Sequence, residues 1–197
     1  MIALVLAACS EAPGTAEKKA KEPEKPPEPV AGQYAFFQLY TAARSWIPDA
    51  KGLSLTSLAI PEVKPQTGKY GAWRAVFVSE SQGRARPYTY AVVESKENAI
   101  FKGVYAGHEE SYVPRGQSKP FLIAALKTDS DVVYETAMKK GAEYARKNPD
   151  KPILFLLELT PRFPGLAWRV VWGESVGTSN FSIYVDATTG EYLQTMR

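Results

Sequence analysis

The chain has 197 residues, of which 45% are hydrophobic and 12% aromatic, enough for one compact core or two small ones. This composition excludes a protein that is disordered throughout. The 24 basic and 21 acidic residues give a formal net charge of +3, so no strong field points to nucleic acid as a partner. The single cysteine, Cys9, excludes a disulfide within this chain and any metal site built from several cysteines.

Residues 1–9 form a short apolar run that ends at this cysteine. Leu6, Ala7, Ala8 and Cys9 resemble the lipobox of bacterial lipoprotein signal peptides, in which an apolar residue and two small residues precede the cysteine. The resemblance implies cleavage before Cys9 and diacylglycerol on its thiol. Each buried methylene contributes roughly 0.8 kcal/mol, so several acyl chains hold a domain at a bilayer. The alternative is an apolar N-terminus with a chance cysteine.

The residue after the cysteine bears on localisation. Ser10 rather than Asp follows Cys9, and this pattern resembles outer-membrane retention in enteric-type sorting. The resemblance implies a lipid-anchored protein of the cell envelope that faces the periplasm in a Gram-negative cell. No basic residue precedes the apolar run, in contrast to the usual signal peptide, which indicates that the start lies further upstream.

Residues 10–32 are predicted to be a disordered linker. Residues 11–30 contain five prolines among alternating Glu and Lys, and no aromatic residue. Such a segment buries too little apolar surface to offset the entropy of ordering it. We expect an extended spacer, with a proline-rich ligand for a partner as the alternative.

A helix and four strands are predicted next. Phe36, Leu39, Ala43 and Ile47 recur at helical spacing and Pro48 follows, so a helix is expected over residues 33–47. Segments of β-branched and aromatic residues, separated by Gly, Pro, Ser and Asn, then predict antiparallel strands. These strands span residues 53–60, 72–80, 87–94 and 100–105.

The same order of elements then begins again. Residues 128–131 have the form of a capping box, Val133, Ala137 and Tyr144 mark an apolar helix face, and residues 148–149 (Asn-Pro) end the helix. Strands are predicted over residues 152–159, 166–173, 180–186 and 191–196. The fold class is therefore α+β, with two helix-plus-antiparallel-sheet units over residues 33–112 and 113–197.

Two local matches favour a tandem repeat of this unit. Residues 46–49 (Trp-Ile-Pro-Asp) match residues 147–150 (Lys-Asn-Pro-Asp), and residues 73–76 (Trp-Arg-Ala-Val) match residues 168–171 (Trp-Arg-Val-Val). Chance similarity is the alternative.

The second unit resembles a known family. Residues 168–172 (Trp-Arg-Val-Val-Trp) and 185–191 (Val-Asp-Ala-Thr-Thr-Gly-Glu) are similar to the W-x-V strand and V-D-A-x-T-G-E hairpin of the PepSY family. The resemblance covers about residues 120–197, with a fainter one over 33–105. It implies a small antiparallel sheet packed against a helix, a binding or inhibitory role, and no catalytic residues.

The hairpin motif also has a physical explanation of its own. Asp186 and Thr189 can accept hydrogen bonds from turn amides, and Gly190 can adopt a positive φ at the end of a short turn. We therefore expect a structural turn, with metal binding through Asp186 and Glu191 as the alternative.

Three further groups of residues are candidate sites. Aromatic residues could form a binding surface for a peptide or glycan, although strand periodicity predicts that most are core; they are Trp73, Tyr90, Trp168, Trp172 and Tyr184. Residues 173–177 match the G-x-S-x-G nucleophile elbow around Ser175, but the next residues predict a turn and a strand rather than the required helix. His108 is the only histidine, and a solvated loop is favoured over a zinc site.

These features predict a non-catalytic envelope lipoprotein that binds a protein or peptide partner, without cofactor, metal or nucleic acid. The alternative is a structural or assembly lipoprotein of an envelope complex. A hydrolase that uses Ser175 is a distant third.

Overall fold

The computed structural model describes residues 26–116 and 118–197, so Cys9, the lipobox and most of the predicted linker lie outside the described residues. The fold already includes Val30, whose backbone N–H and C=O both pair with Tyr70 at 2.9 Å. The first helix begins at Gly32. The linker was predicted to extend to residue 32, just before the aromatic residues begin. The folded part of the chain starts earlier, because Val30 is already paired with Tyr70.

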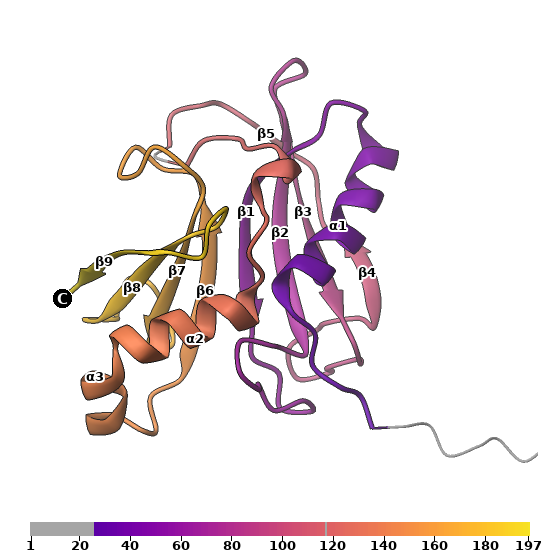
Figure 1. Cartoon of the computed structure of the whole chain (residues 1–197). Coiled ribbons are helices and arrows are strands. Elements are labelled where there is room, and N and C mark those ends of the chain that lie inside the picture. Colours follow the sequence, from indigo (N-terminus) through magenta and orange to yellow (C-terminus); the bar gives the residue numbers. More distant parts are fainter. Residues whose placement is uncertain (1–25, 117) are drawn as a thin grey trace, which may run out of the picture.

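One antiparallel sheet of nine strands runs through the molecule in the order β4-β3-β2-β1-β6-β7-β8-β9, with β5 paired to β3 (Figure 1). The first half contributes β1 (Lys51–Leu58), β2 (Ala72–Ser79), β3 (Arg84–Ala91), β4 (Gly103–Ala106) and β5 (Glu110–Ser111). The second half contributes β6 (Ile153–Glu158), β7 (Ala167–Trp172), β8 (Ser182–Asp186) and β9 (Tyr192–Met196). The α+β class is confirmed; the two-residue strand β5 was not predicted.

The helices pack on one side of this sheet (Figure 1). Helix α1 (Gly32–Trp46) lies over the first half, where Phe36 packs on Phe77 with ring centroids 5.1 Å apart. Helices α2 (Ser130–Lys140) and α3 (Ala142–Lys147) lie over the second half. The short 3-10 helix η1 (Ile123–Ala125) precedes α2.

The second predicted helix is broken into α2 and α3 at Gly141. Gly141 is buried, and a Cβ built there would lie 3.0 Å from Ile183 Cδ1 and 3.2 Å from Trp172 Cη2. A larger side chain would therefore crowd the sheet at the point where the chain changes direction. The apolar spacing alone does not reveal this close approach.

The two halves share one sheet and one core. Strands β1 and β6 pair antiparallel at the centre, with Leu55 opposite Leu157, and one cluster of buried residues includes members of both halves. The Tyr70 hydroxyl adds a link across the centre by donating to the carbonyl of Ile153, and burial raises the pKa of this phenol. Residues 33–112 and 113–197 are thus halves of one packed body.

Two tryptophans at the core make the same contact in each half. Trp73 and Trp168 pack edge to face with centroids 6.2 Å apart. Trp73 Nε1 donates to the Val30 carbonyl, just before α1, and Trp168 Nε1 donates to the Thr128 carbonyl, just before α2, both at 3.0 Å. Each indole therefore fastens the start of a helix to the sheet.

Candidate functional site: the helix-free face of the sheet

Alternation along the strands divides the sheet into two unlike faces. On the side of the helices, a register row contains Ala75, Leu55, Leu157, Trp168 and Val185, each 0% exposed. The neighbouring row points to the other side. It contains one residue from each of eight strands: Tyr105, Thr89, Arg74, Thr56, Leu156, Arg169, Tyr184 and Gln194.

We call this second side the helix-free face, because none of the described helices packs on it. At its centre lie Thr56 on β1 and Leu156 on β6, two partly exposed side chains without charge. Since alternation places Ser54, Val76 and Leu154 on the same side, the floor of the face is largely uncharged.

Loops form the rim of the helix-free face. Near β2 and β3, Ile60 and Val63 pack with Ala72 and Ala91 in a small cluster separate from the main core. Near β8, Phe163 packs on Tyr184 with centroids 5.1 Å apart. The sheet surface between these loops is therefore recessed.

Two hollows lie along this recess, and a third lies at the ends of the two central strands. One of about 180 Å³ is lined in part by Arg74, Phe101 and Tyr105. A second, of about 150 Å³, is lined in part by Glu158, Arg169 and Tyr184. The third, about 540 Å³, lies at the end of β1 and the start of β6; Tyr70 and Ile153 from the side of the helices line it together with Thr56 and Leu154.

Arginine is the dominant charged residue of the face. Arg169 Nε donates to Ser182 Oγ at 3.1 Å, and its guanidinium lies 5.5 Å from the Tyr184 ring centroid. Arg162 lies at the same distance from that ring. Arg74 is exposed and forms no ion pair with a carboxylate in the described part of the chain. Glu158, which accepts from Ser118 Oγ at 2.9 Å, lies in one hollow with Arg162 and Arg169.

Burial places three of the five candidate aromatic residues in the core, as strand periodicity predicted for most of them. Trp73 and Trp168 are 0% exposed and Trp172 is 1% exposed, all on the side of the helices. Tyr90 lies on that side too, edge-on to Tyr34 at 5.8 Å. Of the five predicted residues only Tyr184 points to the helix-free face, because it pairs with Arg169, which alternation places opposite Trp168 and Trp172.

The arginines were missed as site residues although both repeat windows contain them. Arg74 follows Trp73, and Arg169 follows Trp168. Once Trp is assigned to the core, the next residue of a strand must point the other way. The opposite orientation of each Trp and the following Arg was therefore predictable from the sequence, whereas the side of the sheet on which the helices pack was not.

The turn motif lies between β8 and β9. Asp186 Oδ1 accepts from the backbone N–H of Thr188 at 2.7 Å and of Thr189 at 2.9 Å. Thr189 Oγ1 accepts from the Glu191 N–H at 3.3 Å, and Gly190 has φ of 76°. One oxygen of Asp186 is thus engaged in the turn, and no group of three metal-ligating side chains occurs among residues 26–116 and 118–197.

Ser175 lies in the loop between β7 and β8. Its Oγ is 2.7 Å from Thr178 Oγ1, and strand β8 follows the loop. The helix that an elbow needs does not follow it. His108 is exposed between β4 and β5, and its neighbour Glu109 accepts from Trp46 Nε1 at 2.7 Å and pairs with Arg84 at 3.3 Å.

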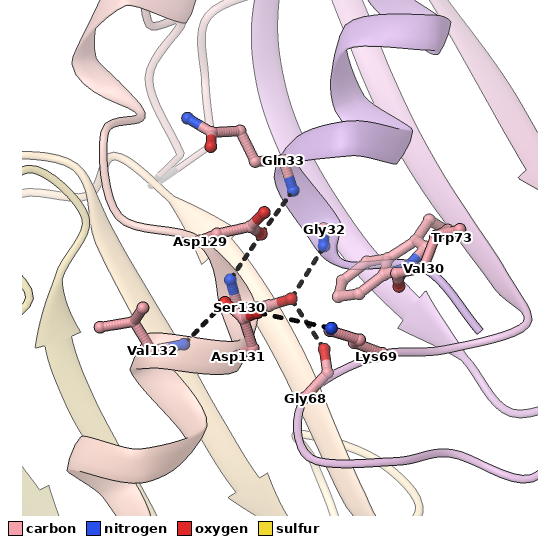
Figure 2. Close-up of polar contacts among 10 residues, drawn as sticks. All are labelled: Val30, Gly32, Gln33, Gly68, Lys69, Trp73, Asp129, Ser130, Asp131 and Val132. Carbon is pink, nitrogen blue, oxygen red and sulfur yellow. Dashed lines mark hydrogen bonds and ion pairs between the residues drawn. The ribbon is translucent and has the colours of Figure 1, made fainter. Parts of the chain in front are cut away.

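The N-termini of α1 and α2 meet in a polar cluster on the side of the helices, shown in Figure 2. Asp129 Oδ1 accepts from the backbone N–H of Gln33 at 2.8 Å and of Ser130 at 2.6 Å. Ser130 Oγ accepts from the Gly32 N–H at 2.8 Å and donates to the Gly68 carbonyl at 2.7 Å. We call these five residues the polar joint.

The polar joint serves structure rather than ligand binding, since its donors and acceptors satisfy one another across the two halves. Burial raises the pKa of the Asp129 carboxyl, and the N–H donors of Gln33 and Ser130 partly offset that rise. The residue that caps α2 is Asp129, one position after the start of the capping box predicted over residues 128–131. Thr128 instead uses its carbonyl to accept from Trp168.

Comparisons with known proteins bear on the fold alone. No family model matches the chain, so the PepSY resemblance rests on its motif, and no curated protein matches it either. The chain is similar to the crystal structure of a "putative lipoprotein" from Clostridium difficile 630, with a TM-score of 0.50 and 11% identity over 82% of this chain and 91% of that one.

Proposed function

We propose that this protein is a lipid-anchored envelope protein that binds a protein or peptide partner on its helix-free face, without catalysis. One observation carries the proposal: a row of eight outward side chains crosses the sheet, and no described helix packs over it. An antiparallel sheet commonly packs one face on the core and leaves the other to solvent, so this face is free to meet a partner. An uncovered, recessed face with a largely uncharged floor and arginines along it is suited to a partner.

The anchor is proposed from the sequence and supported by the fold. Leu6, Ala7, Ala8 and Cys9 resemble a lipobox, and the similar solved structure is itself described as a "putative lipoprotein". At about 3.1 Å per residue, the 21 steps from Cys9 to Val30 would reach about 65 Å if extended. No helix in the described part of the chain is long and apolar enough to cross a bilayer.

We also infer that the halves are two copies of one helix-plus-sheet unit, in which the PepSY-like motif is clearest in the second. The matching indole contacts of Trp73 and Trp168 support this inference. Pro48 and Pro149 occupy matching places too, between the end of a helix and the first strand of each half. Duplication explains why Arg74 and Arg169 lie symmetrically on one face.

The anchor is tested by the mass of the mature N-terminus, purified from membranes. An acylated Cys9 as the first residue is the expected result. A mature chain that retains Met1, or begins at an unmodified Cys9, contradicts the lipid anchor.

The binding face is tested by photo-crosslinking in intact cells. A photoreactive residue at Thr56, in the centre of the helix-free face, should give a discrete adduct with an envelope component. The same residue at Thr41, which is exposed on α1, is the matched control and should not give it. Absence of an adduct from position 56, or equal yields from both positions, contradicts the proposed binding face.

A further inference from the structure

Arg74 and Arg169 are positioned as a pair. They lie in the same register row, separated by Thr56 on β1 and Leu156 on β6. Neighbouring strands are about 4.8 Å apart, so three steps from β2 to β7 place the two backbone positions roughly 14 Å apart. Both side chains leave the same face.

The surface between them suits a flat, extended segment. Thr56 and Leu156 are partly exposed and uncharged, so neither raises a charged barrier along the row. A segment laid across β1 and β6 would contact both of these residues and reach an arginine at each end.

Each arginine adjoins an aromatic hollow. Arg74 lines the hollow formed with Phe101 and Tyr105, whose exposed rings pack with centroids 4.9 Å apart. Arg169 is held beside Tyr184 by its hydrogen bond to Ser182. A guanidinium with a restricted position loses less entropy on binding, and it presents a planar fork that fits a carboxylate.

Resting on the proposed binding function, we propose that the partner segment is an extended polypeptide with two carboxylate side chains four positions apart, one bound by Arg74 and one by Arg169. In an extended chain, residues i and i+4 lie on the same side and about 13 Å apart, which matches the spacing of the arginines. Glu158, in the hollow beside Arg169, disfavours a dense polyanion by like-charge repulsion.

The proposal is tested by fluorescence anisotropy with the full chain and two labelled peptides of identical composition. One peptide has two Glu at i and i+4 in a neutral extended sequence, and the other has the two Glu adjacent. The first should bind at least about tenfold more tightly, and its affinity should fall as salt rises. Equal affinities overturn the proposal, and so does tighter binding of anionic phosphatidylglycerol vesicles than of the first peptide.

Variants assign the effect to the pair. Arg74→Gln and Arg169→Gln should each weaken the i, i+4 peptide about tenfold and abolish the preference for spacing. Arg146→Gln removes the same charge from an exposed site on α3 and should change nothing. Because Arg74 is exposed, its variant should keep the wild-type thermal midpoint, so retained binding in Arg74→Gln alone overturns the proposal.

The outcomes separate this inference from the binding function itself. If the adduct from Thr56 persists in cells carrying Arg74→Gln and Arg169→Gln, the partner is not held by this pair, although the face still binds it. If wild type gives no adduct from Thr56, the proposed function fails whatever the peptides do.

Discussion

The two faces of one sheet differ in how they are used, and adjacent residues of β6 show the contrast. Leu157 points to the helices and is 0% exposed within the shared core. Leu156 points to the helix-free face and stays partly exposed. Because packing contributes to stability in proportion to buried apolar area, the helix side holds the fold together. Residues of the helix-free face can therefore change to fit a partner with little effect on the stability of the fold.

The largest effect expected is therefore a difference between these neighbours. Leu157→Ala should lower the free energy of unfolding by about 2–5 kcal/mol, because it leaves a cavity in the core. Leu156→Ala removes the same atoms from a partly exposed site and should lower it by less than about 1.5 kcal/mol. Urea unfolding of both variants measures the gap, and equal losses would show that the helix-free face is packed in solution.

A second test concerns the crowding at the polar joint, on the side of the helices. Gly68 and Gly103 have nearly the same φ, 82° and 83°, but a Cβ on Gly68 would lie 2.3 Å from the Ser130 carbonyl oxygen, whereas one on Gly103 would meet nothing within 4 Å. Gly103→Ala should lower stability by about 1 kcal/mol for the backbone conformation alone. Gly68→Ala should lower it clearly more, as measured by thermal unfolding. Equal shifts of the thermal midpoint in the two variants would mean that the polar joint has room for a Cβ at Gly68.

Asp129 tests the hydrogen bonds that join the halves. Asp129→Ala leaves the N–H groups of Gln33 and Ser130 without their acceptor and should lower the free energy of unfolding by about 1–3 kcal/mol. Asp129→Asn is the matched control, since its amide oxygen can accept from both donors. If Asp129→Asn loses as much free energy of unfolding as Asp129→Ala, the effect comes from the charge of the carboxylate and not from its hydrogen bonds.

The pH dependence of the same carboxyl gives the smallest effect. Burial raises the pKa of Asp129 above 3.8 in the folded protein, so the folded state binds this proton more tightly than the unfolded state. Its contribution to stability is therefore greatest below 3.8 and decreases as pH rises through the raised value. Relative to Asp129→Asn, wild type should lose stability over that interval in a urea series. The opposite slope would mean that the N–H donors outweigh burial.

The contrast also explains what could be predicted from sequence. The α+β class was predictable because aromatic and β-branched segments alternate at period two, and because the two long helices have clear apolar faces. Pairing of Leu55 with Leu157 was not, since it joins strands about a hundred residues apart with no local signal. Trp73 and Trp168 were expected both as core and as surface, and only the placement of the helices decides which. Cys9 lies outside the described residues, and lipidation stays a prediction.

The central claim is that the helix-free face binds a partner while the other face stabilises the fold, and one substitution tests it directly. Leu156→Asp places a charge in the middle of the floor. We expect the adduct yield from a photoreactive residue at Thr56 to fall at least about tenfold in cells, while the free energy of unfolding stays within about 1.5 kcal/mol of wild type. An unchanged adduct yield in the folded Leu156→Asp protein would contradict the account.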